Sequence, residues 1–122
     1  MPTILLAAPE RDRLSAFADA LAKDPAVSLA WAGSAAEVLA AVREQAPALV
    51  VIDSNLPEPA ALVSDILRMN AMVNTAVVSD MEEEAFHEAT EGLGIMCRLP
   101  PSPGPRDAEE TLEALRRLTP FG

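Results

Sequence analysis

The sequence has few aromatic residues: three phenylalanines, one tryptophan and no tyrosine among 122 residues. It also has only nine lysines and arginines against nineteen acidic residues, which gives a formal net charge of −10. Proteins that bind nucleic acid neutralise phosphates with a basic surface, and those that bind single strands add exposed aromatic rings. A nucleic-acid partner is therefore not expected, and the acidic surface is interpreted as one that keeps the protein soluble.

Cysteine is nearly absent, because Cys97 is the only one. A single cysteine excludes a disulfide framework and a thiolate zinc cluster, and its place in an apolar run predicts a buried, inert thiol. No apolar run approaches the length of a membrane span. A strand that begins near Thr3 leaves no room for a signal peptide. These features predict a soluble, cytoplasmic protein without a membrane partner.

Glycine-rich phosphate-binding loops are missing as well. The turn after the first apolar run is Ala7-Ala8-Pro9-Glu10, which excludes the dinucleotide-binding and P-loop patterns and argues against a flavin mononucleotide loop. Because His87 is the only histidine, a catalytic triad or a histidine-rich metal site is not expected either.

The sequence does contain five short apolar runs that alternate with five segments of helical periodicity. Half of the residues are hydrophobic, and the length suits one core. The alternation predicts an α/β fold: a doubly wound, five-stranded parallel sheet with helices on both faces. No linker or repeat divides residues 1–122, so a single domain is expected. The predicted strands span about 3–8, 27–32, 48–52, 75–79 and 95–99, and the predicted helices about 10–22, 34–46, 58–69, 82–90 and 106–118.

The central run, Ala48-Leu49-Val50-Val51-Ile52, is apolar throughout. Such a run is typical of a strand that is buried on both faces of a parallel sheet. It leads directly into Asp53, and Asn55 and Pro57 mark the turn that follows. Functional sites of open α/β sheets lie at the carboxyl ends of the strands, so Asp53 marks the expected site.

Five βα units with a carboxylate after the third strand resemble the receiver domain of two-component response regulators, over essentially the whole chain. The segment Val50-Val51-Ile52-Asp53-Ser54-Asn55-Leu56-Pro57 is similar to the family's apolar strand, phosphoacceptor aspartate and following proline. The resemblance implies a flavodoxin-like (βα)5 fold, with Asp53 as phosphoacceptor and Ser79 as switch hydroxyl. It also implies Mg²⁺ as cofactor. Mg²⁺ prefers oxygen ligands, and the candidate ligands are Glu10, Asp53 and Asn55.

Two parts of the family's pattern are replaced. The acidic pair after the first strand is Ala8-Pro9 here, and the lysine position at the end of the fifth strand holds Leu99 or Pro101, depending on the register. Arg98 precedes Leu99, and strand alternation directs it to the opposite face. Fewer carboxylates bind Mg²⁺ more weakly, and a missing lysine removes a cation that stabilises the transferring phosphoryl group. Both changes predict slow or absent phosphotransfer.

Two functions follow from the resemblance, and neither is that of an enzyme. The first is a phosphorelay receiver that takes phosphate on Asp53 from a histidine kinase or phosphotransfer protein and signals to a downstream protein partner. The second is a pseudo-receiver that takes no phosphate and works by docking or by forming a homodimer. A small hydrolase with Asp53 as nucleophile is a third interpretation, and it lacks a second charged catalytic group.

Overall fold

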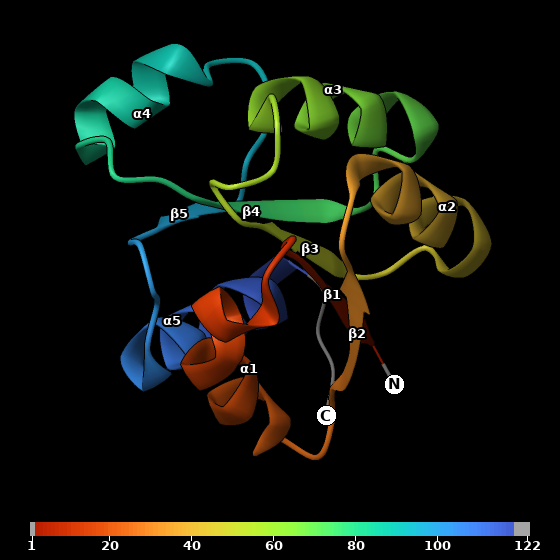
Figure 1. Cartoon of the computed structure of the whole chain (residues 1–122), viewed down its shortest axis with the longest axis vertical. Coiled ribbons are helices and arrows are strands. Elements are labelled where there is room, and N and C mark those ends of the chain that lie inside the picture. Colours follow the sequence, from red (N-terminus) through yellow and green to blue (C-terminus); the bar gives the residue numbers. More distant parts are fainter. Residues whose placement is uncertain (1, 119–122) are drawn as a thin grey trace.

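The computed structural model describes residues 2–118, which form one parallel sheet of five strands in the order β2-β1-β3-β4-β5, with helices on both faces (Figure 1). The strands are β1 (Thr3–Ala7), β2 (Ser28–Ala32), β3 (Leu49–Ile52), β4 (Asn74–Val78) and β5 (Cys97–Leu99). The helices are α1 (Ser15–Ala22), α2 (Ala35–Gln45), α3 (Pro59–Met69), α4 (Glu83–Ala89) and α5 (Pro105–Leu118), with a 3-10 turn η1 (Arg11–Leu14) before α1. This architecture confirms the predicted fold class. Residues 119–122 lie outside the described part.

Alternation along the strands divides the core into two apolar layers. In β3, Leu49 and Val51 join the layer under α1 and α5, whereas Val50 and Ile52 join the layer under α2, α3 and α4. All four of these side chains are fully buried. The continuous apolar run therefore forms a strand that is covered on both faces, as predicted.

The second helix begins where the sequence predicts it. The hydroxyl of Ser34 accepts a hydrogen bond from the Glu37 N–H at 3.2 Å, which satisfies one of the unpaired donors of the first turn. The Glu37 carboxylate in turn accepts from the Gly33 N–H at 2.6 Å. The two bonds resemble a capping box, except that the N–H that donates to the Glu37 carboxylate belongs to Gly33 and not to the cap residue Ser34.

The first helix and the last strand differ from the prediction. Pro9-Glu10 does not begin a regular α-helix, because Glu10 is extended and the 3-10 turn η1 intervenes before α1. The strand β5 begins at Cys97, two residues later than predicted, because its pairing with β4 begins with Ala76 and Cys97. Gly92 and Gly94, with φ values of 85° and 63°, turn the chain just before that strand, a conformation that glycine adopts without strain.

The longest helix, α5, has 14 residues, and no helix within residues 2–118 is long and apolar enough to cross a membrane. One stripe of α5 is buried, and the helix packs beside α1. Arg116 forms an ion pair with Asp24 in the turn after α1. The Asp24 carboxylate also accepts a hydrogen bond from the Ala26 N–H at 2.9 Å. That backbone bond and then Arg116 hold the pKa of Asp24 below its ordinary value.

Cys97 is expected to react slowly with iodoacetamide at neutral pH. Burial raises the pKa of its thiol, Asp107 and Glu110 raise it further, and a hydrogen bond with Thr111 opposes them. Since the thiolate is the nucleophile, alkylation of the folded protein should be slower than alkylation of free cysteine. Mass spectrometry of timed aliquots measures this rate, and urea should restore the ordinary one. Equal rates in the folded and unfolded protein would contradict the prediction.

Candidate functional site

Asp53 lies directly after β3, at the carboxyl end of the sheet. Its N–H donates to the Ala7 carbonyl at 2.9 Å, which ties it to the end of β1, and its own carbonyl accepts from the Leu56 N–H at 3.1 Å. The side chain is 1% exposed. A carboxylate buried to this degree is costly unless it is paired and hydrogen-bonded. Its partners therefore decide what the site can do.

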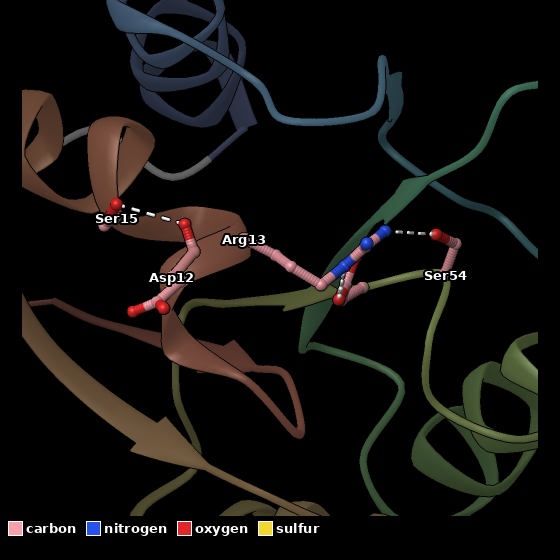
Figure 2. A network of polar contacts seen from close by, with 5 residues as sticks. Asp12, Arg13, Ser15 and Ser54 are labelled. Carbon is pink, nitrogen blue, oxygen red and sulfur yellow. Dashed lines mark hydrogen bonds and ion pairs between the residues drawn. The ribbon is translucent and has the colours of Figure 1, made fainter.

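The partner of Asp53 is Arg13, which lies in η1, the turn that follows β1. Arg13 Nε donates to Asp53 Oδ2 at 2.7 Å, and Nη2 donates to the Ser54 hydroxyl at 3.2 Å. Figure 2 shows the Arg13 side chain extended from η1 toward Ser54. The Arg13 side chain is 33% exposed, so one end of the pair meets water. Asp53 Oδ1 is buried and has no hydrogen-bond partner among residues 2–118.

Ser79 lies at the end of β4, the strand next to β3. Its N–H donates to the Leu99 carbonyl at 2.9 Å, and its hydroxyl accepts from the Met81 N–H at 3.1 Å. The hydroxyl thus stabilises the turn that leads to α4. The structure places Ser79 at the sheet edge that the sequence predicts, and within residues 2–118 no hydrogen bond joins it to Asp53.

Arg98 faces away from Asp53, as strand alternation predicts. Leu99 packs in the layer under α1 and α5, whereas Arg98 lines a hollow beside α4 with Phe86. Arg98 Nη1 donates to the Ser79 carbonyl at 3.0 Å, and its buried Nε has no hydrogen-bond partner in the described part of the chain. The Arg98 guanidinium therefore binds the backbone at the end of β4 and does not take the place of the missing lysine beside Asp53.

The residues around Asp53 do not fit Mg²⁺. Ala8-Pro9 offers no oxygen side chain, and Glu10 and Asn55 are exposed and form no hydrogen bond with Asp53 within residues 2–118. No three histidine, cysteine or acidic side chains come together within residues 2–118. The unpartnered Oδ1 is a single ligand atom, while Oδ2 is already engaged by a guanidinium. Mg²⁺ is usually held by one or two carboxylates together with waters and phosphate oxygens. Here the positive charge of Arg13 already occupies the carboxylate and repels a second cation.

The sequence did not single out Arg13 as a site residue. The available signal was a cation in the turn after the first strand, four positions beyond the Ala8-Pro9 pair that replaces the expected acidic residues. In the sheet, Ala7 pairs with Ile52, so the turn after β1 lies beside Asp53. Of the two arginines in that turn, Arg13 reaches the carboxylate, whereas the Arg11 guanidinium lies 5.1 Å from the centre of the Trp31 ring.

No family model matches the sequence, and no curated protein sequence matches it. Solved structures do match over nearly the whole chain. A CheY-like receiver domain protein from Methanospirillum hungatei superposes with a TM-score of 0.81 and 18% identity, covering 97% of this chain and 96% of its own. A two-component response regulator from Legionella pneumophila gives 0.79 and 16%, covering 96% and 99%. The response regulator domain of CheB from Thermotoga maritima gives 0.79 and 17%, covering 97% and 96%. The chain therefore has the fold of CheY-like receiver domains.

Proposed function

We propose that this protein is a receiver-type signalling module that works through contacts with other proteins and does not accept a phosphoryl group. The observation that carries the proposal is the ion pair between Arg13 and the buried Asp53. The fold supports the signalling class, because its solved neighbours are receiver domains. The partner is a downstream protein or a second copy of the chain.

Phosphoryl transfer to an aspartate depends on positioning and on neutralising the charge of the transferred group. Here Arg13 holds the carboxylate oxygen Oδ2 at 2.7 Å. Within residues 2–118 no cluster of metal-ligating side chains accompanies it, and the end of β5 presents Leu99, which is buried in the core. The site thus lacks the acidic pair and the lysine of the family's pattern, and the remaining carboxylate, Asp53, is paired with Arg13. These features support a carboxylate with a structural role.

A second candidate function is phosphorylation of Asp53 by a histidine kinase or phosphotransfer protein, with Ser79 as the switch hydroxyl. Two observations favour it: Oδ1 is unpartnered, and Arg13 is partly exposed. Arg13 could turn toward water and then neutralise an incoming phosphoryl group in place of a metal.

Incubation with acetyl phosphate and Mg²⁺, followed by intact-mass measurement, separates the two functions. We expect no phosphoryl adduct on the protein, whereas a competent receiver domain in the same tube should acquire one. The Arg13→Ala variant should also stay unmodified, because freeing Asp53 restores neither an acidic pair nor a lysine. An adduct that forms on the natural protein and is absent from Asp53→Ala would overturn the proposal.

A further inference from the structure

An apolar cleft lies between α3 and α4, above the end of β4. Figure 1 shows α3 and α4 on the same side of the sheet. The cleft has a volume of about 230 Å³, and its surface is mainly apolar. Pockets for drug-sized ligands are about 300–1,000 Å³, so this cleft suits one or two side chains of a partner better than a cofactor. The residues that line it include Pro59, Ala60, Val77, Met81, Phe86 and Ile95.

The chain is acidic where it leaves the cleft. Asp80 lines the cleft, and Glu82, Glu83 and Glu84 follow it in the sequence at the start of α4; all four are exposed, and together they are called the acidic end. The sequence has no lysine or arginine between Arg68 and Arg98. Within residues 2–118, none of these four acids forms an ion pair. Their negative charge is therefore not balanced by the protein itself.

We infer that this cleft binds a basic amphipathic segment of a partner protein, with an apolar side chain in the cleft and lysines or arginines facing the acidic end. The inference rests on the proposed function, since it names the partner chemistry of a docking module. Apolar anchors at helical spacing dock into such grooves, and complementary charge speeds and orients the encounter.

The charge pattern decides between this occupant and others. An anionic membrane surface or a nucleic acid would be repelled by the acidic end. A second copy of the chain that docked through the same cleft would bring a second acidic end to the interface, and the two would repel each other. The chain's own most basic segment, Arg116-Arg117, belongs to α5, which packs beside α1 on the other side of the sheet. A basic segment of another protein is the partner whose charge fits.

The test uses a synthetic helical peptide with leucines on one face and lysines on the other, titrated into ¹⁵N-labelled protein. We expect the amide signals of Val77, Met81 and Phe86 to shift, and binding to weaken as salt rises. The triple variant Glu82→Gln/Glu83→Gln/Glu84→Gln should bind the peptide about tenfold more weakly. Ala60→Trp, which fills the cleft from an exposed position, should also weaken binding.

The matched control removes the same charge from α5, by Glu109→Gln/Glu110→Gln/Glu113→Gln, at three exposed positions. It should leave the affinity almost unchanged. The inference would be overturned if the peptide did not bind, or if it shifted amide signals outside the cleft. It would also be overturned if both triple variants lost the same affinity, or if a peptide with serines in place of the lysines bound equally well. None of these results alters the outcome with acetyl phosphate, so failure of the docking site and failure of the proposed function are distinguishable.

Discussion

Replacing Arg13 by alanine is expected to lower the free energy of unfolding by about 3 kcal/mol at neutral pH. The variant leaves the carboxylate of Asp53 buried and without a charged partner. Removing one member of a buried pair costs about 3–5 kcal/mol, and the lower figure applies because a third of the Arg13 side chain already meets water. Urea unfolding measures the change as a shift of the midpoint at constant slope.

The matched variant Asp53→Asn should cost much less, because Arg13 can then turn its guanidinium toward solvent. In the Asp53→Asn background, Arg13→Ala should have almost no effect. The difference between the two backgrounds is the coupling free energy of the pair. If Arg13→Ala cost the same in both backgrounds, the two side chains would not interact in solution, and the interpretation of the site would be wrong.

Phe86→Ala is expected to lower the free energy of unfolding by a similar amount, about 3 kcal/mol. The loss of stability should be concentrated in α4. Within Glu83–Ala89, Phe86 is the buried residue, and the helix has seven residues. Without this anchor, α4 has little apolar contact to hold it on the sheet. Amide hydrogen exchange should become fast across α4 while the strands stay protected. The basic peptide should also lose its binding site.

Phe17→Ala is the control for that experiment, since Phe17 is fully buried in the layer under α1 and α5, on the other side of the sheet. Its loss should lower the global stability without a selective loss of protection in α4. Equal exchange patterns in the two variants would show that α4 does not open independently of the sheet.

Local signals in the sequence predicted much of the fold. The start of α2 depends on Ser34 and Glu37, which are three positions apart, and the apolar run of β3 can be recognised without its neighbours in space. The position of Asp53 followed from the same run, since a parallel sheet brings the carboxyl ends of its strands to one edge. The solved structures confirm the receiver fold that the resemblance implied.

The contact of Arg13 with Asp53 could not be predicted in the same way. It joins residues 40 positions apart, and it depends on the register of β1 against β3 and on the 3-10 turn η1. The sequence indicates a regular helix from Pro9-Glu10, in which the direction of Arg13 would differ. In the structure, Arg13 lies in the 3-10 turn η1, and from there its guanidinium reaches Asp53.

The ¹⁵N–¹H signal of Arg13 Nε, recorded during a titration with Mg²⁺, tests most directly whether this guanidinium holds the carboxylate in solution. If it does, the signal is resolved at neutral pH, is shifted by the charge-assisted hydrogen bond, changes in Asp53→Asn, and does not respond to Mg²⁺. A signal that is lost to exchange with water, together with Mg²⁺-dependent shifts of the Asp53 and Ser54 amides, would show a site open to the metal and contradict the pairing.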